Sequence, residues 1–260
     1  MGNKKRAIVL SGGGIKGAYE IGVWRALKEL DIHYEIVAGT STGSINAALM
    51  VMGDYEKAES LWKNIVVGNL MTETRTAGRS IKGFFQTVLS PKEFMKSKMI
   101  EGSVDNAPFL DFVEKNIEED VIRSSAIDYG LVMVRAKDRK GYAVSKKEIP
   151  DGKMKDYIIA SSSVYPIFPM HQIGEEYFID GMYHDNLPID LAISMGAEEL
   201  IVVDLHQKPQ HPNYAGCSNV LYLTPSADLG GILAFDRKKI NENLELGYRD
   251  AMQKFSIGKG

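Results

Sequence analysis

The sequence has little cysteine, no long hydrophobic run and no excess of basic residues. Its single cysteine, Cys217, cannot form a disulfide within the chain, so a small disulfide-stabilised fold is excluded. No uninterrupted apolar run approaches the about 20 residues that a membrane-spanning helix needs. The basic start Lys4-Lys5-Arg6 precedes only four apolar residues, too few for the core of a signal peptide. A cytoplasmic protein is therefore expected.

The charge balance also excludes one class of partner. The chain has 31 Lys and Arg residues against 34 Asp and Glu residues, a net charge of −3, which argues against a general nucleic-acid binder. Hydrophobic residues make up 44% and charged residues 25% of the 260 positions, the mix of an ordinary globular protein. No repeat, low-complexity tract or linker divides the chain, so we predict a single domain over residues 1–260.

The first fifty residues alternate between two kinds of pattern. Apolar runs at Ala7–Leu10 and Tyr34–Ala38 predict strands, and each is followed by glycines and an expected helix, at Ala18–Leu30 and Ser44–Met52. This alternation indicates a parallel sheet covered by helices. Further strands are expected at Tyr129–Arg135, Gly141–Ser145, Tyr177–Ile179, Glu199–Asp204 and Val220–Leu223, and further helices at Asp54–Val67, Ala107–Asn116, Leu187–Met195 and Asp236–Phe255.

A G-x-S-x-G pattern follows the second predicted strand. In Gly39-Thr40-Ser41-Thr42-Gly43 the serine occupies the turn between a strand and a helix, where side chains two positions away would collide. Glycines at both positions remove that clash and leave the Ser41 hydroxyl exposed beside a helix N-terminus, which favours developing negative charge. A glycine-bounded turn without chemistry is the alternative.

A second glycine cluster, Gly12-Gly13-Gly14-Ile15-Lys16-Gly17, follows the first predicted strand. Its backbone N–H groups are unobstructed by Cβ atoms and can form a cradle for an anion. One hypothesis is a dinucleotide-binding loop, but the second strand lacks the acidic residue at its end that would bind a ribose. The other is an oxyanion hole for an acyl-transfer reaction, which is the simpler account beside a reactive serine.

The serine needs a base. The five histidines are His33, His171, His184, His206 and His211, of which His184 lies nearest an interesting motif. Asp180 is the better candidate, because it ends an apolar strand and precedes Gly181. An ordinary Asp-Gly turn is its alternative role. Asp204, after Ile201-Val202-Val203, is a reserve acid, whereas Cys217 lies in a polar stretch and is a poor nucleophile candidate.

Three motifs in chain order resemble the patatin-like phospholipase family: the glycine cluster at 12–17, the serine motif at 39–43 and Asp180-Gly181. Asn186 and Pro188 also match the family pattern, and the likeness spans about Lys4 to Gly196. The resemblance implies a three-layer α/β/α fold with a mostly parallel sheet. It also implies hydrolysis of lipid acyl esters by a Ser–Asp dyad without histidine.

Carried over to this chain, the resemblance makes Ser41 the nucleophile and Asp180 the base. The amides of Gly12, Gly13 and Gly14 would form the oxyanion hole. Two positions depart from the family: Lys16 stands where arginine is usual, which keeps the charge but loses the planar fork. Met182 stands where a small residue is usual, and a narrower pocket or an altered acyl-chain preference is expected there. No metal-ligand spacing is visible, and neither metal nor cofactor is expected. A nucleotide-binding protein or oxidoreductase remains the alternative function.

Residues 68–100 differ in composition from the rest of the chain. They hold six Lys and Arg residues against two Glu residues, together with several Phe, Met, Val and Leu residues. Basic charge combined with bulky apolar groups is typical of peripheral membrane contact. A mobile lid or membrane-facing cap is one hypothesis for this segment, and a solvated loop is the other.

Overall fold

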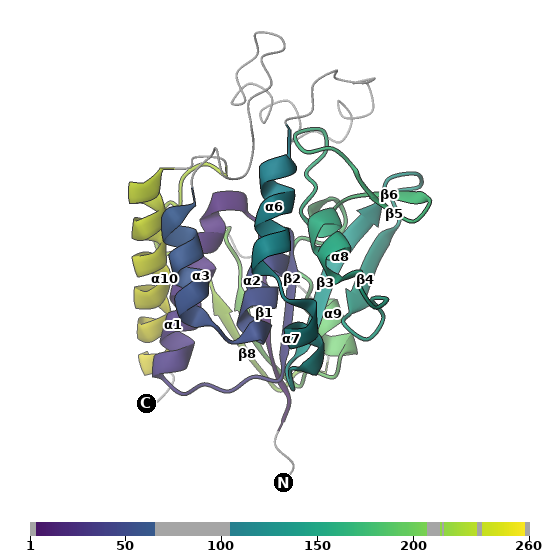
Figure 1. Cartoon of the computed structure of the whole chain (residues 1–260). Helices are drawn as coiled ribbons and strands as arrows, with labels where there is room; N and C mark the ends of the chain where they lie inside the picture. The colour runs from purple at the N-terminus through teal and green to yellow at the C-terminus, as the bar shows by residue number, and fades with distance from the viewer. Residues whose placement is uncertain (1–3, 66–104, 207–213, 215, 233–235, 258–260) are drawn as a thin grey trace.

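A mixed sheet lies at the centre of the computed structural model, which describes residues 4–65, 105–206, 214, 216–232 and 236–257 (Figure 1). Within these residues eight strands pair in the order β5-β6-β3-β2-β1-β7-β8, and β4 pairs with β3 outside this order. The strands are β1 (Arg6–Leu10), β2 (Ile36–Thr40), β3 (Asp128–Arg135), β4 (Gly141–Ser145), β5 (His171–Ile173), β6 (Glu176–Asp180), β7 (Glu199–Val203) and β8 (Asn219–Leu223).

The central strands are parallel and buried on both faces. The pairs β2/β3, β1/β2, β1/β7 and β7/β8 are parallel, whereas β4, β5 and β6 make antiparallel pairs. A strand covered on both faces has to be apolar at successive positions, and this explains the continuous run from Ala7 to Leu10.

Two helical layers cover the sheet. Ile8 and Leu10 pack into the larger core, and Ala7 and Val9 point to the opposite face, where α9 packs. The larger core includes side chains from every other α-helix of the described chain. The helices are α1 (Ala18–Glu29), α2 (Thr42–Met52), α3 (Tyr55–Asn64), α6 (Ala107–Asn116), α7 (Glu119–Ser124), α8 (Met154–Ser161), α9 (Ile189–Ser194) and α10 (Arg237–Ile257), with 3-10 helices η1 (Gly14–Gly17) and η3 (Gly181–Tyr183).

The pairing of β3 brings two distant segments together. Its residues 130–134 pair with β4 along one edge, so β2 and β6, which overlap β4 along β3, must both lie on the other edge. On that edge β2 ends with Thr40 opposite Val132, and β6, running the other way, ends with Asp180 opposite Met133. The two strands therefore meet end to end, and the residues that follow them face one another.

The expected fold class, a three-layer α/β/α arrangement with a mostly parallel sheet, is confirmed. The pattern did not predict α7, α8 or β5, which are short and lack a periodic signal of their own. No helix among the described residues is both long and apolar enough to cross a bilayer. The expected lid at 68–100 and His211 both lie outside the described residues.

Candidate active site

Ser41 occupies a strained turn between β2 and α2. Its backbone has φ 56° and ψ −127°, a conformation that non-glycine residues rarely adopt. The two flanking glycines have no room for a side chain. A Cβ at Gly39 would lie 2.2 Å from the Gly43 carbonyl oxygen, and a Cβ at Gly43 would lie 2.6 Å from the Leu10 carbonyl oxygen. The steric explanation of the G-x-S-x-G spacing therefore agrees with the contacts.

Gly43→Ala is expected to distort this turn, because the new methyl group meets backbone rather than a flexible side chain. We expect a loss of about 1–3 kcal/mol in the free energy of unfolding and a loss of the site's geometry. Chemical denaturation measures the first. The control is Gly53→Asn at the end of α2, where φ is +83° and no atom lies within 4 Å of an added Cβ. Equal stability of the two variants would contradict the steric account.

Ser41 and Asp180 are hydrogen-bonded across the junction of β2 and β6. The Ser41 hydroxyl donates to Asp180 Oδ2 at 2.6 Å, although the two residues are separated by 139 positions. Both are buried, with Asp180 fully inaccessible and Ser41 6% exposed, so the expectation of an exposed serine hydroxyl is wrong. The second carboxylate oxygen, Oδ1, accepts the backbone N–H of Met182 at 2.8 Å, so both oxygens are held in place. The serine hydroxyl is thus aimed at a fixed carboxylate.

Burial changes the protonation of Asp180. Removal from water raises the pKa of its carboxyl group to about 7, against the hydrogen bonds from Ser41 and Met182, which favour the ionised form. A carboxylate with a pKa near 7 is a stronger base than an ordinary aspartate and can exchange a proton at physiological pH. The pair therefore has the geometry that general base catalysis requires, and Asp180 has a suitable pKa.

Ser161 supports the turn, in a role that the sequence did not reveal. The Ser41 backbone N–H donates to Ser161 Oγ at 3.0 Å, and the Ser161 hydroxyl donates to the Val132 carbonyl at 2.6 Å. Val132 is the β3 residue at which β2 ends, so its carbonyl oxygen faces the junction. A hydroxyl that both accepts and donates at a buried position fixes the strained backbone of Ser41 to the sheet.

The glycine loop lies beside Ser41. A Cβ at Gly12 would lie 3.0 Å from Ser41 Cβ, which places this loop against the nucleophile candidate. The Gly12 N–H donates to the Asn186 carbonyl at 3.1 Å, and Asn186 Nδ2 donates back to the Gly12 carbonyl at 3.1 Å. Neither the Gly13 nor the Gly14 N–H makes a hydrogen bond to another described residue. Of the three predicted donors, Gly12 therefore already has a partner.

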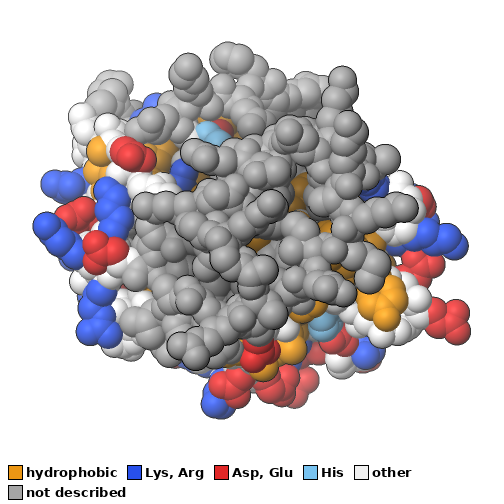
Figure 2. All heavy atoms as spheres, turned by 90° about the horizontal axis from the view of Figure 1, so that it is seen from above, with side chains coloured by type: hydrophobic (Ala, Val, Ile, Leu, Met, Phe, Trp, Pro, Cys, Tyr) orange, Lys and Arg blue, Asp and Glu red, His pale blue; other side chains and the backbone are white. Residues whose placement is uncertain are grey.

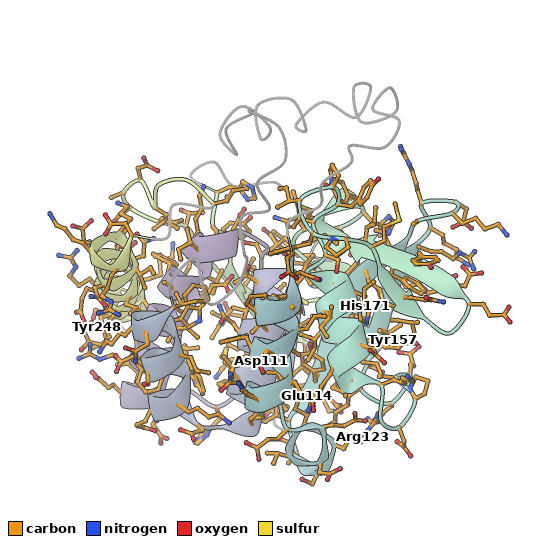
Figure 3. All side chains as sticks on the ribbon, turned by 45° about the horizontal axis from the view of Figure 1, so that its top comes forward. Asp111, Glu114, Arg123, Tyr157, His171 and Tyr248 are labelled. Atoms are coloured by element: carbon orange, nitrogen blue, oxygen red, sulfur yellow. The ribbon has the colours of Figure 1, made fainter. Side chains whose placement is uncertain are left out.

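The described histidines do not hydrogen-bond to this pair. His171, which is labelled in Figure 3, contacts Asp156 of α8 through Nε2 at 3.0 Å, and the ring of His184 lies against Gly141. His33 is exposed beside Asp31. Within the described ranges, no histidine ring hydrogen-bonds to Ser41 or Asp180. A histidine base between the two residues is therefore not observed.

Asp204, the reserve acid, has other partners. Its Oδ1 contacts His206 Nδ1 at 2.7 Å, and its Oδ2 accepts the Tyr222 hydroxyl at 2.6 Å. Burial opposes ionisation, but these hydrogen bonds outweigh it and lower the pKa of Asp204 below its ordinary value. Asp204 is thus an anion at the end of β7, and its hydrogen bonds go to His206 and Tyr222 rather than to Ser41.

The remaining predicted residues occupy varied surroundings. Lys16 is half-buried in η1, and Gly17 and Gly181 are buried, with Gly181 packed against the Val132 carbonyl. Met182 is 39% exposed. Burial raises the pKa of the half-buried Cys217 thiol, which disfavours a nucleophilic thiolate. No group of three or more potential metal ligands is present in the described part of the chain.

The end of the molecule that carries the site has a mixed surface. Figure 2 looks down on this end and shows charged side chains of both signs around its rim, with hydrophobic side chains among them. This is the carboxyl end of the parallel strands β1 and β2, where open α/β sheets bind their ligands. The location therefore agrees with a binding site.

Comparisons with known proteins identify the family. Residues 8–193 match the family model for patatin-like phospholipase. The chain is 26% identical over 207 residues to patatin-like phospholipase domain-containing protein 7 of Rattus norvegicus, and 28% identical over 202 residues to protein 6 of that name from Homo sapiens. It is 28% identical over 201 residues to lysophospholipase NTE1 of Mycosarcoma maydis. These alignments cover 76–78% of this chain but only 9–14% of those longer proteins.

A solved structure gives the same result for the fold. VipD from Legionella pneumophila superposes with a TM-score of 0.61 at 14% sequence identity, covering 98% of this chain and 67% of that one. Since the family model spans well over half of the sequence, and since the serine and aspartate motifs fall within it, the assignment is direct. The chain belongs to the patatin-like phospholipase family.

Proposed function

We propose that this protein is a serine hydrolase of lipid acyl esters that uses Ser41 as nucleophile and Asp180 as base. The observation that carries the proposal is the 2.6 Å hydrogen bond from the Ser41 hydroxyl to a buried carboxylate whose pKa lies at about 7. A nucleophile that touches its base directly needs no intervening imidazole. The family assignment supports the substrate class, because its name describes phospholipases.

The reaction proceeds in two steps. Asp180 Oδ2 accepts the Ser41 proton as Oγ attacks the ester carbonyl, and the carbonyl electrons move to its oxygen. Collapse of this intermediate breaks the bond to the alcohol, which takes the proton from Asp180 and leaves an acyl-enzyme. A water molecule then gives a proton to Asp180 and attacks the acyl carbon. The fatty acid departs and the proton returns to Ser41.

Two amides stabilise the oxyanion in this proposal. Gly13 and Gly14 have N–H groups with no acceptor among the described residues, whereas the Gly12 N–H is bonded to Asn186. Preorganised donors of this kind contribute about 3–4 kcal/mol each to transition-state stabilisation. Gly12 and Asn186, bonded in both directions, hold the loop beside Ser41. In this proposal Gly13 and Gly14 are the oxyanion donors, and Gly12 holds the loop in place through Asn186.

A substrate panel tests the proposal. The purified chain is incubated with phospholipids, lysophospholipids and neutral glycerides, and released fatty acids are detected by mass spectrometry beside the Ser41→Ala protein. We expect fatty acid release that depends on Ser41, and lysophospholipids are included because one relative is named a lysophospholipase. Saturable NAD binding without labelling by a fluorophosphonate would instead favour the nucleotide-binding alternative.

The pH dependence of hydrolysis follows from Asp180. Only the ionised carboxylate accepts the serine proton, so kcat/KM is expected to rise as the pH increases through about 7 and then to level off. An aspartate with an ordinary pKa would place this midpoint about three pH units lower. Initial rates with p-nitrophenyl butyrate from pH 5 to 9 measure the midpoint. A rate already constant at pH 5 would contradict the raised pKa.

Met182 offers a test of substrate selectivity. Its backbone N–H contacts Asp180, but its side chain is 39% exposed, so Met182→Ala keeps the catalytic contact and opens space beside it. We expect the ratio of kcat/KM for long and short acyl esters to change by about 3- to 10-fold. Tyr177→Ala is the control, because Tyr177 is a 49% exposed residue of β6 that lies three positions before the carboxylate. The same change in both variants would remove Met182 as a selectivity residue.

A further inference from the structure

The glycine loop is joined to the nucleophile helix by a buried polar cluster that the proposed mechanism does not use. The cluster consists of Gly17, Glu20, Asn46 and Trp62, which come from η1, α1, α2 and α3. Glu20 is 1% exposed, Asn46 is fully buried and Trp62 is 6% exposed. Burying polar side chains costs free energy, because each group loses its hydrogen bonds to water. Such a cluster therefore indicates a structural or functional role.

Asn46 makes three hydrogen bonds within this cluster. Its Oδ1 accepts the Trp62 Nε1–H at 2.9 Å. Since an indole nitrogen only donates, this bond fixes which end of the amide is the oxygen. The Nδ2 group then donates to the Gly17 carbonyl at 3.0 Å and to Glu20 Oε2 at 2.8 Å. The amide is therefore fully oriented and connects three elements.

Gly17 carries this connection to the site. A Cβ at Gly17 would lie 2.5 Å from Thr42 Cγ2 and 3.0 Å from Asn46 Nδ2, so the loop backbone is in direct contact with α2. Thr42 immediately follows Ser41, and Gly17 closes the turn that begins with Gly14. Any shift at Asn46 therefore changes the separation of the loop from the serine.

Glu20 accepts the hydrogen bond from Asn46 through Oε2. Its Oε1 is buried and has no hydrogen-bond partner. Burial raises the pKa of Glu20 well above its ordinary value, and the negative charge of Asp204 at the end of β7 raises it further, against the hydrogen bond from Asn46 and the backbone N–H of Ser11. Burial without a neighbouring cation therefore favours the uncharged form of Glu20.

We infer that Asn46 and Glu20 are positioning residues that hold the oxyanion-binding loop at a fixed distance from Ser41. The inference rests on the proposed function, and it adds residues that touch neither substrate nor the reacting atoms. Glu20 acts as a neutral acceptor that orients Asn46, and Asn46 binds the loop carbonyl of Gly17. Misplacing a catalytic group by about 1 Å costs about 100-fold in rate, so a small movement here has a large effect.

The test compares four variants by kcat and KM for p-nitrophenyl butyrate, with active sites titrated by a fluorophosphonate. Asn46→Leu and Glu20→Leu are expected to lower kcat per titrated site by about 10- to 100-fold and to leave KM nearly unchanged. Glu20→Gln keeps the acceptor without a charge and is expected to retain kcat within about threefold. Tyr19→Phe is the control, because it removes the partly buried hydrogen bond that the residue before Glu20 makes to Asp250 of α10.

Several results would overturn the inference. An unchanged kcat per titrated site in both leucine variants would mean that the cluster serves folding alone. A Glu20→Gln protein as slow as Glu20→Leu would mean that the ionised form is required. If the leucine variants do not fold, Trp62→Phe removes only the indole donor to Asn46, and an unchanged kcat there counts against the inference. Hydrolysis that survives in Ser41→Ala would instead refute the proposed function, so the two failures are distinguishable.

Discussion

Replacing Ser41 with alanine is expected to lower ester hydrolysis by at least about 10³-fold while leaving the fold intact. The Oγ atom is the proposed nucleophile, and its hydroxyl donates to Asp180. The strained backbone at Ser41 is held by Ser161 through the main-chain N–H, a bond that alanine keeps. Initial rates with a chromogenic ester measure the loss, and thermal unfolding measures the stability. Alanine should also prevent labelling by a fluorophosphonate.

The matched control for this loss is Ser163→Ala. Ser163 is also a buried serine near the junction, but its hydroxyl donates to the Ile159 carbonyl of α8 and not to the carboxylate. Only its backbone carbonyl contacts Asp180, and alanine retains that bond. Activity within about threefold of the parent is expected for Ser163→Ala. Comparable losses in the two variants would mean that the assay reports structural damage rather than chemistry.

Asp180→Asn is expected to be inactive and yet more stable than the parent at neutral and alkaline pH. The amide cannot accept the serine proton, so hydrolysis should fall by at least about 10³-fold. Because the pKa of Asp180 is about 7 in the folded protein and near 3.8 in the unfolded chain, ionising it costs folding free energy. The gain on substitution therefore grows from about pH 4 to pH 7 and then stays constant, with an upper bound of about 4 kcal/mol.

Asp204→Asn is a control in which the expected change in folding stability has the opposite sign. Its carboxylate is also buried, but hydrogen bonds from His206 and Tyr222 outweigh burial and lower its pKa, so the ionised form stabilises the fold. Asp204→Asn should therefore lose stability above the pKa of the unfolded aspartate, in the same urea titrations in which Asp180→Asn gains it. If both variants lose stability, the ionised Asp180 carboxylate does not destabilise the folded protein. Such destabilisation by a functional group is expected where activity and stability conflict.

The sequence predicted local features of the site more reliably than long-range ones. Gly39 and Gly43 indicate a sharp turn at Ser41 because the reason is steric and local, and the contacts agree. The place of Asp180 at a strand end made it a candidate base and the family resemblance paired it with Ser41, but their approach depends on β2 and β6 meeting on one edge of β3. No local pattern encodes that arrangement.

Other features of the site could not be predicted from the sequence, because they also depend on long-range contacts. The Gly12 amide is bonded to Asn186, 174 positions away, so the sequence could not separate an anchoring amide from oxyanion donors. Glu20 lies within an amphipathic helix pattern, where a charged residue is normally placed on the solvated face. Its burial against Asn46 depends on the packing of α1 on α2. Short α8, which carries Ser161, lacks a periodic signal.

The rate at which a fluorophosphonate modifies Ser41, followed by mass spectrometry as a function of pH, tests the central claim most directly. This reaction needs the serine nucleophile and its base but no lipid-binding step. We predict a rate that rises to a plateau with a midpoint near pH 7 in the parent. In Asp180→Asn the rate should be at least about 10²-fold lower and independent of pH. An equal rate in the two proteins, with the same pH dependence, would show that another group activates the serine.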